Sequence, residues 1–150
     1  MRKLFLLCII LLAAAVSYGQ EVEKPRVLLA FEKTLFKTQL IDAMKKELEQ
    51  AGCEVTVIEH SKKGLVASAD DYDAIFITNS GVNSKVRPWI TEWLDGSRDH
   101  KDRILLHTTQ TRDWKVLAEV DAVTSASSRK NVNALAAEYT ERLKKIIAER

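Results

Sequence analysis

The chain has 150 residues, 46% of them hydrophobic, which suits one domain with a single buried core. Its 23 Lys and Arg residues nearly balance its 21 Asp and Glu residues, so no excess of positive charge draws it to nucleic acid, and we expect no partner of that class. No internal repeat and no Pro- or Gly-rich linker divides the sequence.

Residues 1–19 are typical of a cleavable export signal. Arg2 and Lys3 precede the unbroken apolar stretch 4–16, and small or tolerated residues follow as far as Gly19. The stretch is shorter than the roughly 20 residues that span a bilayer. We therefore expect cleavage near Gly19, a periplasmic or secreted mature protein, and no stable membrane span after cleavage.

Cleavage would leave a formally neutral chain with Cys53 as its only cysteine. Loss of Arg2 and Lys3 reduces the basic residues from 23 to 21, against 21 acidic residues. A single cysteine excludes an intramolecular disulfide, even in a compartment that permits one. Residues 20–25 read as a short polar lead, so we expect one domain over residues 26–150.

Strand-like and helix-like patterns alternate along this domain. Apolar and β-branched runs indicate five strands, at 26–31, 54–58, 72–78, 103–107 and 120–123. Apolar side chains at helical spacing indicate three helices. The first contains Leu40, Ile41, Met44 and Leu48 and closes at Gly52, the second contains Val86, Ile90 and Leu94, and the last covers residues 132–147.

This alternation predicts an α/β domain with a parallel sheet that is covered by helices on both faces. Ligands of such sheets bind beyond the carboxyl ends of the strands. Polar segments follow four of the predicted strands, at 32–38, 79–85, 108–114 and 124–128. We therefore expect the binding residues to lie in these segments.

The segments 27–31, 51–57 and 71–78, with a helix led by Thr38 after the first, resemble those of a flavodoxin domain. The likeness extends to about Trp114 and is greatest to the short flavodoxins related to menaquinone-dependent protoporphyrinogen oxidases. It implies a three-layer, doubly wound sheet of five parallel strands in the order 2-1-3-4-5. It also implies flavin mononucleotide (FMN) as cofactor, held by the loops after strands one, three and four.

The turn after the first strand departs from the flavodoxin pattern. Flavodoxins place hydroxyls and a glycine there, so that backbone amides approach the phosphate at the helix N-terminus. In this chain Phe36 stands roughly where the glycine would be and is expected to crowd the backbone of the phosphate loop, while Glu32 brings a negative charge that opposes phosphate. This departure argues against ordinary noncovalent FMN binding. The phosphate-binding candidates that remain are the hydroxyls of Thr34 and Thr38 and the charges of Lys33 and Lys37.

The loop after the third strand is closer to the flavodoxin pattern. Asn79 and Ser80 could hydrogen-bond to the edge of the flavin ring, and Gly81 would permit an unusual turn. The alternative is that these residues only cap the start of the next helix.

The fourth strand is followed by Thr108 and Thr109 as further donors and by Trp114, which could stack on the flavin or simply pack in the domain. His107 ends this strand and could relay protons, the alternative being a histidine satisfied by its neighbours. His60 ends strand two, and we expect it to lie far from the site. The short connection to strand five leaves little room for the usual fourth helix.

Residues 121–127, Asp-Ala-Val-Thr-Ser-Ala-Ser, resemble the acceptor motif of exported proteins that receive FMN through a phosphoester. Asp121 and Thr124 match motif positions, and the hydroxyl of Ser127 would be the acceptor. The alternative is a polar connection whose hydroxyls cap the next helix. The full set of cofactor-binding candidates is Lys33, Thr34, Thr38, Asn79, Ser80, Gly81, Thr108, Thr109, Trp114 and Ser127.

The function that these patterns indicate is an exported electron carrier with FMN, for which Ser127 is the candidate site of covalent attachment, and its expected partners are a redox protein and a flavin transferase. The alternative is a flavodoxin-like domain without cofactor that serves as a binding or interaction module, which the poor phosphate loop favours. A hydrolase-like α/β domain is a third interpretation. The sequence shows no Ser-His-Asp arrangement, Gly-rich nucleotide loop, paired-carboxylate motif or metal-site spacing that would support it.

Overall fold

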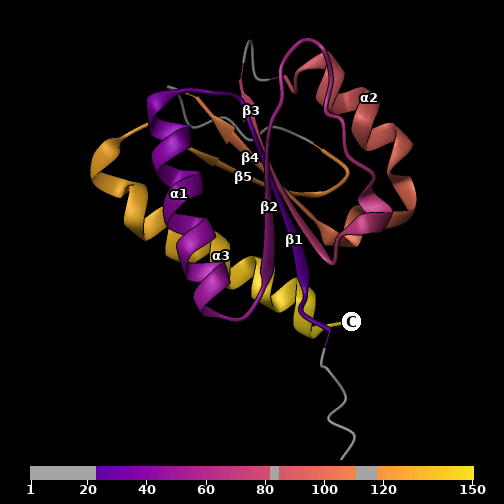
Figure 1. Ribbon diagram of the computed structural model, residues 1–150. Coiled ribbons are helices and arrows are strands. Elements are labelled where there is room, and N and C mark those ends of the chain that lie inside the picture. The colour runs from indigo at the N-terminus through magenta and orange to yellow at the C-terminus, as the bar shows by residue number, and fades with distance from the viewer. Residues whose placement is uncertain (1–22, 82–84, 111–117) are drawn as a thin grey trace, which may run out of the picture.

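The computed structural model describes residues 23–81, 85–110 and 118–150, which contain one five-stranded sheet (Figure 1). The strand order is β2-β1-β3-β4-β5, and every neighbouring pair is parallel. The predicted doubly wound α/β fold is therefore confirmed. The strands are β1 (Arg26–Phe31), β2 (Glu54–Glu59), β3 (Ala74–Ser80), β4 (Ile104–Thr109) and β5 (Asp121–Ser125).

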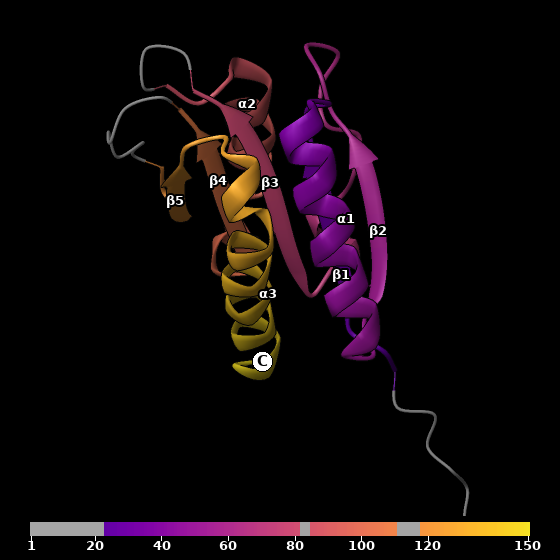
Figure 2. The same cartoon turned by 90° about the vertical axis from the view of Figure 1, so that its left-hand side faces the viewer.

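Helices cover both faces of the sheet and complete three layers. Helices α1 and α3 lie side by side on one face, and α2 lies on the other (Figure 2). Neighbouring residues of a strand point to opposite faces, so Leu28 packs in the apolar cluster under α2, while Leu29 packs in the larger cluster under α1 and α3. The helices are α1 (Leu35–Gln50), α2 (Pro88–Gly96) and α3 (Val132–Ala148).

The three central strands are buried almost throughout, and the two outer strands are not. In β1, β3 and β4 nearly every side chain is buried, whereas β2 and β5 carry exposed and half-buried residues. A strand covered on both faces has no solvent side, so its sequence is continuously apolar. This is why the central strands were the easiest to recognise from the sequence.

Helix α1 begins at Leu35, earlier than the predicted start at Thr38. Thr34 caps it, because its Oγ1 accepts a hydrogen bond from the backbone N–H of Lys37 at 3.2 Å. Phe36 therefore lies in the first turn of the helix, where only 6% of it is exposed. The prediction that Phe36 crowds a phosphate-binding loop is wrong, since the turn between β1 and α1 consists of residues 32–34 alone.

Strands β3 and β4 both continue two residues beyond their predicted ends. Asn79 pairs with Thr108, and Ser80 pairs with Thr109. These four residues were expected in loops and are instead the last residues of central strands. They were assigned to loops because their side chains are polar, and hydropathy alone cannot distinguish a polar strand end from a loop.

Several predictions concern residues outside the described ranges, and two of them concern whole segments. The export signal, residues 1–19, and most of the connection between β4 and β5 lie there, so both stay predictions. Within the described ranges, no helix is long and apolar enough to cross a membrane.

Candidate functional site

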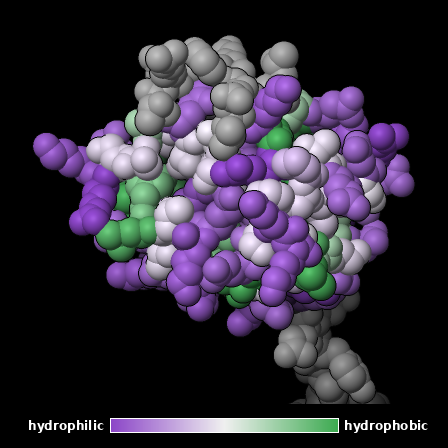
Figure 3. Space-filling model, turned by 90° about the horizontal axis from the view of Figure 1, so that it is seen from above, coloured by the Kyte–Doolittle hydropathy of each residue, from purple (hydrophilic) through white to green (hydrophobic). Residues whose placement is uncertain are grey.

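The candidate site is the carboxyl end of the sheet, whose surface is largely hydrophilic (Figure 3). Most of the predicted residues converge there: Ser80 and Thr109 end neighbouring strands, and Thr34 caps the N-terminus of α1. Lys33 lies at the same end of the sheet but points away from them, because its Nζ is 3.6 Å from Oε2 of Glu59, the exposed last residue of β2. Trp114 lies outside the described residues.

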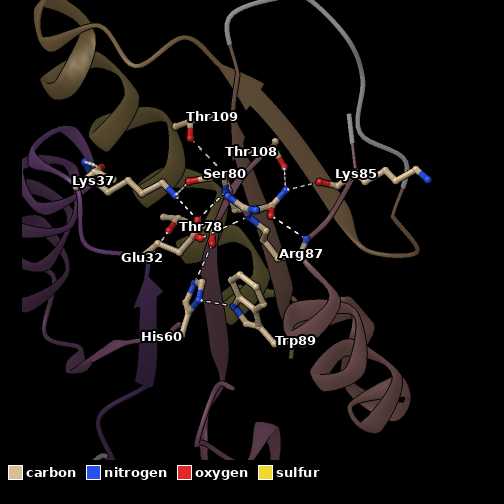
Figure 4. A network of polar contacts seen from close by, with 12 residues as sticks. Glu32, Lys37, His60, Thr78, Ser80, Lys85, Arg87, Trp89, Thr108 and Thr109 are labelled. Atoms are coloured by element: carbon tan, nitrogen blue, oxygen red, sulfur yellow. Dashed lines mark hydrogen bonds and ion pairs between the residues drawn. The ribbon is translucent and has the colours of Figure 1, made fainter. Parts of the chain in front are cut away.

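A carboxylate, Glu32, occupies the middle of this end of the sheet (Figure 4). Its Oε2 accepts hydrogen bonds from Nζ of Lys37 and from the backbone N–H of Ser80, both at 2.7 Å. Lys37 also donates to Oγ of Ser80 at 2.8 Å. On the other side, Nε of Arg87 lies 3.7 Å from Oε1 of Glu32. One carboxylate thus faces two cations and a backbone amide.

The protonation of Glu32 and Lys37 follows from these contacts. Burial raises the pKa of Glu32, but the hydrogen bonds from Lys37 and Ser80 outweigh it and hold the pKa below its ordinary value. Burial lowers the pKa of Lys37, and the contacts with Glu32 only partly oppose this shift. The Lys37 side chain is 1% exposed, so the pair is an internal salt bridge and not a surface one.

These residues do not fit the phosphate of a noncovalently bound FMN. Lys37 was expected to offset the phosphate charge, but its ammonium already faces Glu32 and Ser80. The Ser80 N–H is likewise taken by Glu32. A phosphate brought to this turn would meet a carboxylate at close range, and like charges there repel.

Both polar atoms of the Asn79 side chain form hydrogen bonds with neighbouring segments of the chain. Its Oδ1 accepts a hydrogen bond from the N–H of Arg87 at 3.1 Å, and its Nδ2 donates to Oγ1 of Thr108 at 3.1 Å and to the carbonyl of Lys85 at 3.4 Å. Asn79 and Thr108 are both buried. They position the chain before α2, and they do not present free groups to a flavin ring.

Gly81 allows close packing against the neighbouring strand end and does not form an unusual turn. Its φ is not in the positive range, unlike those of Gly52 and Gly64. A Cβ at this position would lie 3.0 Å from Cγ2 of Thr108 and 3.2 Å from Oε1 of Gln110. The expectation of an unusual backbone conformation at Gly81 is therefore wrong.

His60 lies closer to the site than the sequence predicted. Its Nε2 donates to the backbone carbonyl of Thr78 on β3 at 2.8 Å, since its Nδ1 accepts a hydrogen bond from Nε1 of Trp89 at 3.2 Å. Burial lowers the pKa of His60, which keeps the ring neutral. Both nitrogens are occupied, and the described residues contain no group of three or more His, Cys, Asp or Glu side chains that could hold a metal ion.

A buried polar cluster that the sequence did not reveal lies between the sheet and α3. Nε2 of His107 is 2.8 Å from Oγ of Ser125 on the neighbouring strand, and Ser125 also hydrogen-bonds to the hydroxyl of Tyr139 on α3. Burial raises the pKa of Tyr139 to about 12 and lowers that of His107 to about 3. The register of β4 and β5 could have suggested the pair, because His107 opposes Val123 and Ser125 lies two residues further on the same face.

The proposed acceptor, Ser127, is exposed in the short segment between β5 and the 3₁₀ turn Arg129–Asn131. Thr124 is half-buried in β5. Asp121 begins that strand, and its carboxylate accepts a hydrogen bond from Arg142 on α3 at 3.1 Å. The motif therefore runs along the edge strand and ends in an accessible hydroxyl.

Comparison with known proteins gives a likeness of structure only. No protein-family model and no curated protein matches the sequence. Among solved structures, a flavodoxin from the domain Archaea superposes with a TM-score of 0.54 at 10% identity, covering 81% of this chain and 98% of that one. Flavodoxin 1 from Bacillus cereus superposes with a TM-score of 0.55 at 10% identity, covering 80% and 97%.

The fold is flavodoxin-like. The strand order and both of these single-domain structures agree on it. The flavodiiron protein from Giardia intestinalis also superposes, with a TM-score of 0.58 at 12% identity over 87% of this chain, but the chain spans only 38% of that protein. At such low identity the likeness establishes the fold, and a doubly wound sheet supports many functions.

Proposed function

We propose that this chain is an exported flavodoxin-like electron carrier that holds FMN on a phosphoester to Ser127. The observation that carries the proposal is the exposed hydroxyl of Ser127, which follows the edge strand β5 at its carboxyl end. Doubly wound sheets bind their ligands at this end. The similar structures include several flavodoxins, two of them described as oxidised, and they support a flavin as the ligand.

Attachment requires an activated flavin phosphate, such as a flavin dinucleotide, and a transferase outside this chain. Oγ of Ser127 attacks the phosphorus of the FMN moiety, so that a new P–O bond forms while the phosphoanhydride bond breaks. A nucleoside monophosphate leaves, and the hydroxyl proton passes to a base of the transferase. Because Ser127 is exposed, the enzyme can reach it in the folded domain.

A tether at Ser127 is compatible with the poor phosphate site at the turn after β1. Glu32 already occupies the groups in that turn that would bind a phosphate. A covalent bond to Ser127 would hold the FMN without them. Strands β3 and β4 separate β1 from β5, so the phosphate of a tethered flavin lies on the β5 side of the sheet.

Ser127→Ala is expected to abolish covalent flavin without unfolding the domain, because Ser127 is exposed and lies outside any helix or strand. The protein is produced with its signal in a host that contains a periplasmic flavin transferase, and the yellow colour that survives denaturation is measured. Ser128→Ala is the matched control, since Ser128 precedes the 3₁₀ turn without a side-chain capping bond, and it is expected to keep the flavin. An adduct that persists in Ser127→Ala would refute the assignment.

A specific observation favours a second candidate, an interaction module without cofactor. The polar groups of Glu32, Lys37 and Asn79 satisfy one another at the carboxyl end of the sheet, which leaves few donors directed at a ligand. An unmodified, colourless protein in the same experiment would support this function. Colour that is lost on denaturation would instead indicate a conventional, noncovalent flavodoxin.

A further inference from the structure

The groups around Glu32 form an oxoanion-binding niche. Lys37 and the backbone N–H of Ser80 each donate to the carboxylate at 2.7 Å. Arg87 lies on the other side, and its Nε is buried, forms an ion pair with Oε1 of Glu32 at 3.7 Å and has no hydrogen-bond partner. Two cations around one carboxylate leave an excess of one positive charge, so the niche can accept more negative charge than Glu32 brings.

Each donor of this niche is held in place independently of Glu32. Ser80 is the last residue of β3 and pairs with Thr109 of β4. The N–H of Arg87 is bound to Asn79, and its guanidinium carbon lies 5.6 Å from the ring centroid of Trp89. Lys37 belongs to the first turn of α1 and donates to Oγ of Ser80 as well as to Glu32. The niche is therefore preformed, which lowers the cost of binding an ion in it.

We propose that Glu32 is an internal anion that fills this niche and excludes phosphate from it. Glu32 is thus the specificity-determining residue of the turn between β1 and α1, with Lys37, Ser80 and Arg87 as the anion-binding groups. The truncation Glu32→Ala removes a carboxymethyl group, which is close in size to a phosphate ion, and leaves two cations without a counter-ion. The niche of the variant then binds inorganic phosphate. The proposal does not depend on attachment of FMN at Ser127.

The test is a titration of Glu32→Ala with inorganic phosphate. Binding is monitored by nuclear magnetic resonance, through the chemical shift of the backbone amide of Ser80. The expected result is a saturable shift of this resonance, with an affinity about tenfold or more above that of the wild type, and no such shift with chloride at equal ionic strength. Glu59→Ala is the matched control, because it removes an exposed carboxylate that faces Lys33 at the same end of the sheet. It is expected to behave as the wild type does.

Two further variants keep the test decisive. Glu32→Ala combined with Lys37→Met is expected to lose the phosphate affinity, because one of the two cations is gone. If Glu32→Ala unfolds in chloride, we expect phosphate to restore its fold, and Glu32→Ser provides a second truncation for the same measurement. Wild-type protein that binds phosphate as tightly as Glu32→Ala, or folded truncations that show no saturable shift, would overturn the proposal. Failure of both truncations to fold in phosphate would overturn it as well.

Discussion

Replacing Phe36 with alanine is expected to lower the free energy of unfolding by about 4 kcal/mol, the usual cost of removing a large buried aromatic side chain. Phe36 lies in the core under α1 and α3, and its ring centroid is 6.4 Å from that of His107. Truncation leaves a cavity beside the buried end of β4. The change is measured by chemical denaturation followed by far-ultraviolet circular dichroism.

The neighbouring residue provides the control for this prediction. Leu35 lies in the same helical turn but is 55% exposed, so Leu35→Ala is expected to change the stability by less than about 0.5 kcal/mol. Equal effects of the two substitutions would contradict the placement of Phe36 in the core. Phe36→Gly is expected to cost about 1 kcal/mol more than Phe36→Ala, because glycine is unfavourable within a helix, and not to improve FMN binding.

Acidification is expected to destabilise the protein through His107, from pH 6.5 down to about 3. The unfolded chain binds a proton at the ordinary histidine pKa of 6.5, whereas burial first, and the charge of Lys37 second, lower the pKa in the folded state to about 3. The unfolded state therefore holds more protons between these pH values, and stability falls by about 1.4 kcal/mol per pH unit. Protonation would also place a buried N–H at Nδ1, which has no hydrogen-bond partner.

Glu32 and His60 also have lowered pKa values and also contribute to the dependence of stability on pH. The contribution of His107 is therefore obtained by comparing the wild type with a variant that lacks this histidine. Free energies of unfolding are measured at several pH values for the wild type and for His107→Phe, in which an aromatic ring still faces Phe76 and Tyr139. The variant is expected to lose less stability than the wild type as the pH falls. The control Leu35→Ala, which removes an exposed side chain that does not titrate, is expected to keep the wild-type slope. Identical slopes for wild type and His107→Phe would refute the assignment.

The central strands could be predicted from the sequence, because burial on both faces leaves a continuous apolar run, whereas the strand order was predicted from the resemblance to flavodoxins and is confirmed by the sheet. The start of α1 could not be predicted, since the segment from Leu35 to Thr38 mixes apolar and charged residues, and the cap at Thr34 is recognised only from its bond to the N–H of Lys37. The ends of β3 and β4 were missed for a similar reason. Polar residues such as Asn79 and Thr108 continue these strands because they satisfy each other across them.

Most of the predicted site residues lie together at the carboxyl end of the sheet, but several of them make contacts that were not predicted. Lys37 was predicted to offset the charge of a phosphate, yet it is buried against Glu32 and Ser80. The contact between Glu32 and Ser80 joins residues 48 positions apart, and no local pattern encodes such a pairing. The contact of His60 with β3 is also between residues distant in sequence, and it forms because β2 and β3 lie on either side of β1. No local pattern in the sequence predicts it. The stacking role of Trp114 stays a prediction.

The central claim, a flavin on Ser127, is tested most directly by a tandem mass spectrum of the tryptic peptide that ends at Arg129, taken from protein exported in the presence of a flavin transferase. The account predicts that this peptide is heavier by one FMN less one water and that the fragment ions place the added mass on Ser127. An unmodified peptide, or added mass on Thr124, Ser125 or Ser128, would contradict it.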